Sequence, residues 1–249
     1  MAGPSVTGRP DAAVPGDPVV AQAADALVER LGTCGDPVRA ARQQEYLKSS
    51  RTFYGCSVPA VRAVVRAVLD EYGILARSSL VRLVEEMWGV GVAAPFEHRV
   101  AAAELLAHRV SVLTPEDLEW LGGRIADGET WAIVDRLAVD VAGAVVEAAP
   151  ETCEPVLDRW AISDELWVRR AAMLALLRSL RRSDDRWQQF CRYAEAMMDD
   201  REFFIRKAIG WVAREVAKRR PGTAGPWVER HRDAMSGVTR REATRYLSA

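Results

Sequence analysis

Apolar side chains recur along most of this chain at the three- and four-residue intervals of an amphipathic helix. Alternating runs rich in β-branched residues, which would predict strands, do not occur. Prolines and glycines interrupt the helical pattern repeatedly. We therefore predict an all-α protein of about a dozen helices, over residues 18–31, 36–48, 59–72, 78–88, 95–109, 114–128, 130–148, 151–161, 164–181, 184–199, 201–219, 225–235 and 238–247.

The domain organisation follows from the same pattern. Residues 1–17 hold closely spaced prolines and glycines, and we expect them to form a disordered tail. Residues 18–249 are then a single domain, because each unit of a helical repeat packs only on its neighbours and needs no separate core.

Six charged positions recur at intervals of 37, 36, 35, 37 and 34 residues: Arg62, Arg99, Asp135, Arg170, Lys207 and Arg241. A period of about 35–40 residues is typical of arrays in which pairs of helices stack on one another. Equivalent positions of successive repeats then line up on one surface. Five of these positions are cationic and one is a carboxylate. This ladder indicates a groove for a polyanion with a reactive centre.

Charge is unevenly distributed along the chain. Residues 167–249 hold 19 basic and 10 acidic side chains (+9), and residues 1–166 hold 15 and 25 (−10), which together give the net charge of −1. A basic final third suits phosphate contacts, although Arg-rich helices are about as often merely solvated.

Other classes of protein are disfavoured by composition. The four cysteines are scattered without a C-x-x-C pair and only three histidines exist, so we predict no metal, no cofactor and no disulfide framework. No apolar run is long enough to span a membrane, and the first residues lack a signal-peptide pattern. We expect a cytoplasmic monomer that acts at the nucleoid.

The candidate reactive centre combines an acid, two indoles and two cations. Trp131 and Asp135 are four residues apart, as are Lys207 and Trp211, so each pair shares a helix face. Arg170 occupies the rung next to Asp135. Carboxylates and indole rings favour a positive partner, whereas arginine and lysine favour phosphate.

A nucleotide whose sugar is becoming an oxocarbenium ion carries both features, because its anomeric carbon is positive and its phosphates are negative. Asp135 could stabilise that cation and orient a water molecule. No general acid is needed if the leaving base is already cationic, as N3- and N7-alkylated purines are. Each residue alone has an ordinary explanation in packing or solvated charge, and only their joint placement on the ladder favours catalysis.

At these residues the chain resembles the AlkD family of bacterial DNA alkylation repair glycosylases. The resemblance extends over about residues 20–248. It is carried by Tyr46-Leu-Lys48, Phe53-Tyr-Gly55, Trp131-Ala-Ile-Val-Asp135, Leu166-Trp-Val-Arg-Arg170-Ala-Ala and, most specifically, Phe203-Phe-Ile-Arg-Lys207-Ala-Ile-Gly-Trp211-Val-Ala-Arg214-Glu.

The resemblance implies a solenoid of HEAT-like repeats, about six antiparallel helix pairs with a concave face that binds duplex DNA. It also implies a monofunctional glycosylase that removes N3-alkyladenine and N7-alkylguanine without extruding the base, and so tolerates bulky adducts. Asp135 would be the catalytic carboxylate, with Trp131 and Trp211 on the deoxyribose. The expected DNA contacts are Arg170, Lys207, Tyr46, Arg99, Arg206, Arg214, Arg169 and Arg241.

The chain departs from the family pattern at Ala132 and Ile133, between Trp131 and Asp135, and in its acidic first two thirds. These departures bear on substrate range, and relatives that act on antibiotic adducts suggest a self-resistance role. Two alternatives remain open. One is a non-catalytic relative that binds distorted or branched DNA, and the other is a protein-interaction scaffold, for which an apolar or acidic groove would be expected.

Overall fold

The computed structural model of the protein describes residues 17–73, 76–89 and 94–247 of the chain. The predicted N-terminal tail therefore lies outside the described residues, except for Asp17. That residue caps the first helix, since its carboxylate accepts the Val19 N–H at 3.1 Å and the Ser79 hydroxyl at 2.9 Å.

The regular structure within these described ranges is entirely helical, as predicted. The predicted boundaries lie within about four residues of the observed ones. The helices are α1 (Pro18–Thr33), α2 (Pro37–Leu47), α3 (Val58–Tyr72), α4 (Arg77–Trp88), α5 (Phe96–His108), η1 (Val110–Val112), α6 (Asp117–Ala126), α7 (Trp131–Asp135), η2 (Arg136–Ala142), α8 (Gly143–Ala148), α9 (Pro150–Ala161), α10 (Leu166–Leu174), α11 (Leu177–Leu180), α12 (Trp187–Ala196), α13 (Phe203–Ala217), α14 (Pro221–His231) and α15 (Gly237–Ala243).

Three predicted helices differ in detail from the structure. The helix predicted over 164–181 is divided into α10 and α11 by a turn at residues 175–176. Helix α14 begins at Pro221 instead of residue 225, because proline is well tolerated in a first turn whose N–H groups need no helical acceptor. The predicted helix over 130–148 is continuous, but it contains the π-helical segment η2 between α7 and α8. Such π turns occur often at functional sites.

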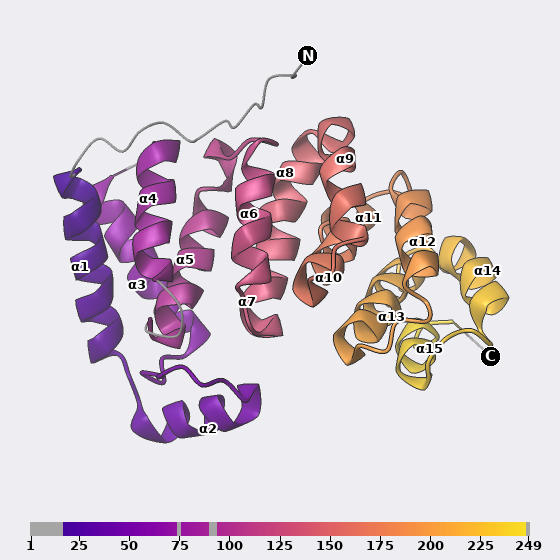
Figure 1. Cartoon of the computed structure of the whole chain (residues 1–249), viewed down its shortest axis with the longest axis horizontal. Coiled ribbons are helices and arrows are strands. Elements are labelled where there is room, and N and C mark those ends of the chain that lie inside the picture. The colour runs from indigo at the N-terminus through magenta and orange to yellow at the C-terminus, as the bar shows by residue number, and fades with distance from the viewer. Residues whose placement is uncertain (1–16, 74–75, 90–93, 248–249) are drawn as a thin grey trace, which may run out of the picture.

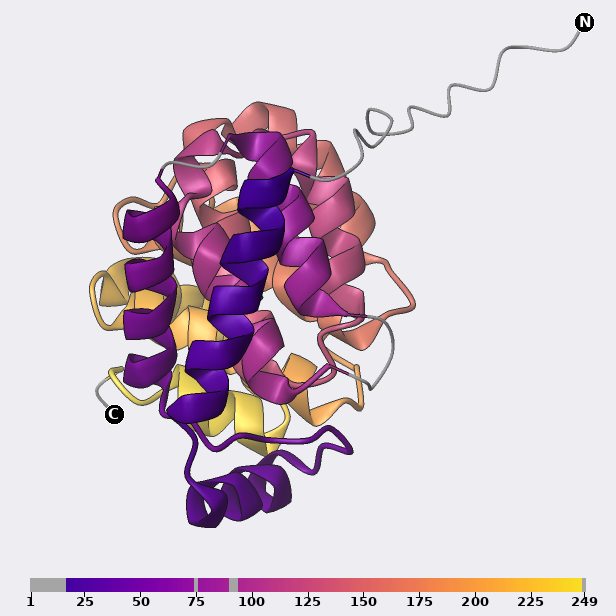
Figure 2. The same cartoon turned by 90° about the vertical axis from the view of Figure 1, so that its left-hand side faces the viewer.

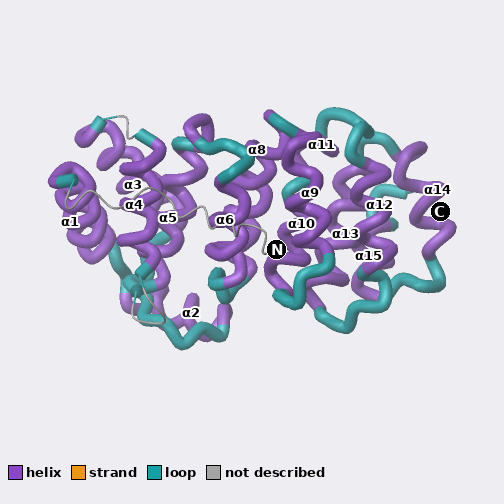
Figure 3. Tube along the Cα trace, turned by 45° about the horizontal axis from the view of Figure 1, so that its top comes forward, coloured by secondary structure: helices purple, strands orange, loops and turns teal. Residues whose placement is uncertain are grey.

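The helices follow one another in a row along the long axis of the molecule, from α1 at one end to α14 and α15 at the other (Figure 1). Helix α2 stands apart from this row, and the view from the α1 end shows the same separation (Figure 2). Figure 3 shows that loops flank α2 on both sides. Buried apolar side chains run without interruption from α1 to α15 and form one continuous core.

Ion pairs between neighbouring helices follow the spacing of the sequence ladder. Several join residues that are 35 to 42 positions apart, which is about one repeat: Arg62–Glu104, Arg77–Asp117, Asp135–Arg170, Glu151–Arg186 and Asp184–Arg220. Ion pairs at this spacing join segments that neighbour one another along the row of helices.

Helix α2 is held to the body of the protein through the loop that follows it. No α2 residue is buried. The loop supplies the backbone oxygens that Arg39, Gln43 and Gln44 bond. The loop itself is anchored by the buried carboxylate of Glu97, which accepts backbone N–H groups of residues 54–56 at 2.7–3.0 Å.

Two cysteines lie together at the base of this segment, a proximity that their scattered positions in the sequence did not reveal. The sulfur atoms of Cys34 and Cys56 are 2.7 Å apart, and both thiols donate to the carbonyl of Leu31. Both cysteines are free thiols. Because Cys34 follows α1 and Cys56 precedes α3, the segment that carries α2 begins and ends beside the Leu31 carbonyl of α1.

Gly55 is required for the close approach between α2 and its loop. Its φ is +83°, and a Cβ atom there would lie 2.1 Å from the carbonyl oxygen of Asp36. We predict that Gly55→Ala lowers the free energy of unfolding by about 1–3 kcal/mol, measured by urea denaturation. Gly32→Ala is the matched control, because Gly32 lies in α1 with open space around it, and it should stabilise by about 0.4–1 kcal/mol. Equal effects of the two substitutions would contradict this account.

Candidate functional site

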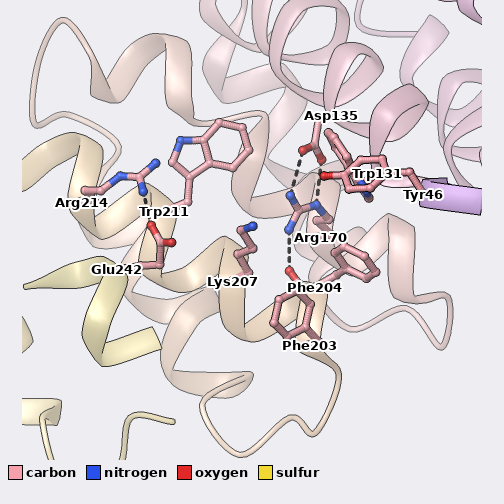
Figure 4. A pocket seen from close by; sticks show the side chains of 10 residues that line it. All are labelled: Tyr46, Trp131, Asp135, Arg170, Phe203, Phe204, Lys207, Trp211, Arg214 and Glu242. Atoms are coloured by element: carbon pink, nitrogen blue, oxygen red, sulfur yellow. Dashed lines mark hydrogen bonds and ion pairs between the residues drawn. The ribbon is translucent and has the colours of Figure 1, made fainter. Parts of the chain in front are cut away.

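An open groove of about 510 Å³ lies between α2, α7, α10, α13 and α15. Figure 4 shows the side chains that line it. It brings together residues that are far apart in the sequence: Tyr46, Trp131, Asp135, Arg170, Phe203, Phe204, Lys207, Trp211, Arg214 and Glu242. All of the residues of the predicted reactive centre are among them.

Asp135 is held in place by a bidentate ion pair. Nε and Nη2 of Arg170 donate to its two carboxylate oxygens at 2.8 and 2.9 Å. Nη1 of Arg170 donates to the backbone oxygen of Phe204 at 2.5 Å. The Arg170 side chain is only 3% exposed, whereas that of Asp135 is 19% exposed. Arg170 therefore orients the acid from behind, and the acid retains access to the groove.

The local helix geometry explains why Trp131 and Asp135 face the same side. Both lie in α7, where the regular α-helical spacing places residues four apart on one face. The wider π-helical turn begins only at Arg136, after the acid. Asp135 therefore keeps its register with Trp131, while the following residues are shifted relative to an uninterrupted α-helix.

Helix α2 reaches the groove through Tyr46. The Tyr46 ring meets the Trp131 ring edge to face, with centroids 6.2 Å apart and planes at 88°. Tyr46 is nevertheless 73% exposed, because α2 lies outside the row of helices. The pair of rings therefore forms a wall of the groove that depends on the position of α2 (Figure 4).

Helix α13 supplies the opposite wall. Trp211 follows Lys207 by one helical turn, and the guanidinium carbon of Arg170 lies 5.9 Å from the centroid of the Trp211 ring. The Nζ atom of Lys207 lies 5.8 Å from the centroid of Phe203, which is 51% exposed. No carboxylate in the described ranges lies within ion-pair distance of Lys207, so its charge is available to a ligand.

Comparisons with known proteins assign this chain to a family. Residues 27–247 match the family model described as DNA alkylation repair enzyme. The chain belongs to the DNA alkylation repair enzyme family. This membership confirms the resemblance to AlkD-like proteins that the sequence motifs indicated.

Solved structures agree with this assignment at the level of the fold. A protein from Enterococcus faecalis, described as a predicted DNA alkylation repair enzyme, is 21% identical with a TM-score of 0.76, over 86% of this chain and 97% of its own. AlkD2 from Streptococcus mutans is 16% identical with a TM-score of 0.60, over 84% and 98% of the two chains. The comparison with curated proteins found no match.

Four of the predicted DNA contacts of this member of the DNA alkylation repair enzyme family do not line the groove. Arg99 is fully buried, where it bonds the side chain and backbone of Asp127 and the backbone oxygen of Trp88. Arg169 pairs with Asp200 at 3.2 Å. Arg206 donates to the backbone oxygen of Asp200. None of these three, nor Arg241, lines the groove.

Three lining residues were absent from the candidate set that the sequence suggested. Phe203 and Phe204 stand at the start of the most specific motif, and Phe203 is four residues before Lys207, which was a usable signal. Glu242 directly follows the last rung of the ladder. One residue corresponds to a rotation of about 100° around a helix, so Glu242 and not Arg241 faces the groove.

The described residues hold no group of three or more His, Cys, Asp or Glu side chains arranged to bind a metal ion. Across the same ranges, no helix is long and apolar enough to cross a membrane. His98, the residue directly before Arg99, is not among the residues that line the groove. Burial lowers the pKa of its imidazole, and Nε2 lies 3.2 Å from the Tyr54 hydroxyl.

The bidentate pair predicts a strong structural effect of removing Arg170. Arg170→Met leaves the largely buried carboxylate of Asp135 without its partner, and we expect a loss of about 2–4 kcal/mol in the free energy of unfolding. Arg159→Met is the control, because the Arg159–Glu119 pair is 59% and 61% exposed and should contribute about 0–1 kcal/mol. Similar midpoints of urea denaturation for the two variants would refute this role of Arg170.

Proposed function

We propose that this protein is a DNA glycosylase that hydrolyses the N-glycosidic bond of cationic N3- or N7-alkylated purines in duplex DNA. Family membership supports an enzyme that acts on alkylated DNA. The observation that carries the specific proposal is the geometry of Asp135. Its carboxylate is fixed by a buried arginine and faces a groove walled by Trp131 and Trp211.

The reaction requires stabilisation of positive charge on the sugar. As the bond from C1′ to the base nitrogen breaks, its electrons leave with the base, which neutralises the alkylated purine and makes C1′ positive. The fixed anion of Asp135 stabilises that charge without reorganisation. The electron-rich faces of Trp131 and Trp211 act in the same direction. Water then adds to C1′, its proton passes to Asp135 or solvent, and an abasic site remains.

The same site needs no proton donor for the departing base. An N3- or N7-alkylated purine is already cationic and leaves as a neutral molecule. Neutral bases in normal DNA would leave as anions, which the carboxylate of Asp135 does not favour. Selectivity for alkylated purines thus arises from the charge of the substrate as much as from its shape.

The shape of the groove supports a reaction without base extrusion. The groove is open to solvent, whereas base-extruding enzymes enclose the base in a snug pocket. We therefore propose that the deoxyribose enters between the two indoles while the base stays in the duplex, which would allow bulky adducts. The comparisons give no support to the predicted role in antibiotic self-resistance, and we do not propose it.

The set of proposed DNA contacts is smaller than the set that the sequence suggested. Lys207, Arg214 and Tyr46 line the groove, and we propose that they contact phosphate and sugar. Arg170 acts through Asp135, because its guanidinium is occupied by that carboxylate and by the Phe204 carbonyl. We propose that the row of helices is a HEAT-like solenoid and that this groove lies on its concave, DNA-binding face.

The two alternative functions account less well for the groove. A protein that only binds distorted DNA gains nothing from an anion fixed among phosphates, and the Asp135–Arg170 pair is such an anion. A protein-interaction scaffold would not require a groove lysine such as Lys207 to lack a carboxylate partner. Both alternatives predict that alkylated bases are never released.

Asp135→Asn tests the catalytic assignment. Because the amide retains the shape of the side chain but not its charge, we expect binding to N7-methylguanine duplex to stay within a few-fold. Single-turnover release of the base, followed by chromatography, should fall by about 10²–10³-fold. Asp140→Asn is the control, since Asp140 lies outside the groove and pairs with Arg136. Undiminished release by Asp135→Asn would remove Asp135 from its role.

Lys207→Gln tests the phosphate contacts. Loss of one cation that meets a phosphate should lower the slope of log affinity against log salt by about 0.9 for duplex DNA, independently of sequence. The measurement is a binding titration at several salt concentrations, with Arg232→Gln, at the exposed residue that follows α14, as a charge-matched control. A wild-type protein that does not bind duplex DNA would favour the scaffold. An unchanged slope in Lys207→Gln would exclude Lys207 as a contact.

A further inference from the structure

The groove contains a second carboxylate that the proposed chemistry does not use. Glu242 lines the groove together with Arg214 and forms an ion pair with Nη1 of that arginine. Asp135 and Glu242 are the two acids among the lining residues of this groove. An acid in a surface that binds a polyanion lowers affinity, so its presence calls for a physical reason.

Helix α15, which carries Glu242, does not depend on this ion pair for its place. Gly210 of α13 allows α15 to approach closely, since a Cβ atom there would lie 2.7 Å from Cβ of Glu242 and 2.8 Å from the Thr239 carbonyl oxygen. The buried Thr239 hydroxyl donates to the backbone oxygen of Arg206 at 3.0 Å. Ala243 is also fully buried. The Arg214–Glu242 pair is therefore not needed to dock the helix.

The two arginine–carboxylate pairs of the groove differ in how tightly they are held. Arg170 is 3% exposed and is fixed by Asp135 and a backbone oxygen. Arg214 and Glu242 are 20% and 24% exposed, so solvent reaches both partners. The first pair is built to stay closed, and the second can open when another anion approaches. Figure 4 shows the second pair on the far side of Trp211 from Asp135.

We propose that Glu242 is an internal counter-ion that occupies the phosphate-binding face of Arg214 in the absence of DNA, and that a backbone phosphate replaces it on binding. This inference rests on the proposed function, because it assigns to the same groove a residue that sets its affinity for duplex DNA. Each binding event must then displace Glu242, which weakens the retention of the protein on undamaged DNA and on the abasic product.

The test uses Glu242→Gln in the full-length protein. We expect it to bind undamaged duplex about three- to tenfold more tightly at low salt, with a slope of log affinity against log salt that is steeper by up to about 0.9. Glu215→Gln is the control with the same change of charge, since Glu215 pairs with Arg181 and Arg219 away from the groove. It should change affinity by less than about twofold.

A double-mutant cycle separates this role from a purely structural one. In an Arg214→Gln background, Glu242→Gln should no longer tighten binding, because the phosphate site that it opens is gone. Unchanged or weaker binding by Glu242→Gln with native circular dichroism would overturn the inference, as would tightening that persists without Arg214. If Glu242→Gln does not fold, Glu242→Ala in the same cycle decides by the same criteria. Wild-type protein that neither binds duplex DNA nor releases alkylated bases would instead refute the proposed function.

Discussion

The bidentate ion pair between Asp135 and Arg170 is the interaction on which the architecture and the site both depend. It joins α7 to α10 across 35 residues, one period of the repeat. The arginine is buried and the acid is partly exposed, so one contact joins α7 to α10 and also orients the carboxylate toward the groove. Burying an arginine is costly unless its charge and its N–H groups are satisfied. Here the acid and the Phe204 carbonyl satisfy them.

The groove around this pair combines aromatic rings with cationic side chains. Trp131 and Trp211 flank Asp135 with apolar, electron-rich faces, which suits a sugar that becomes positive. On α13, Lys207 precedes Trp211 by four residues and Arg214 follows it by three, and both cations line the groove, where their charge suits phosphate. Tyr46 comes from α2, which has no buried residue and lies outside the row of helices, so that wall of the groove depends on the position of this segment.

Much of the fold was predictable because proline, glycine and apolar periodicity are local signals. The ladder also brought together Asp135 and Arg170, which are 35 residues apart in the sequence and form an ion pair in the groove. The ladder predicted a DNA contact at Arg99, but this arginine is buried against the Trp88 ring. Repeat spacing gives a position along a helix and does not show which segments bury the side chain at that position. It also named Arg241 where Glu242 faces the groove. These outcomes depend on contacts between distant segments, which no single-sequence pattern encodes.

The central claim is that an immobile anion, with no proton donor assigned to the base, selects substrates whose base is already cationic. The direct measurement compares single-turnover release of N7-methylguanine and of hypoxanthine from duplexes of identical sequence. The account predicts release of the charged N7-methylguanine and no detectable release of the neutral hypoxanthine. Comparable release of both bases would contradict it, because a neutral base needs a proton that this mechanism does not supply.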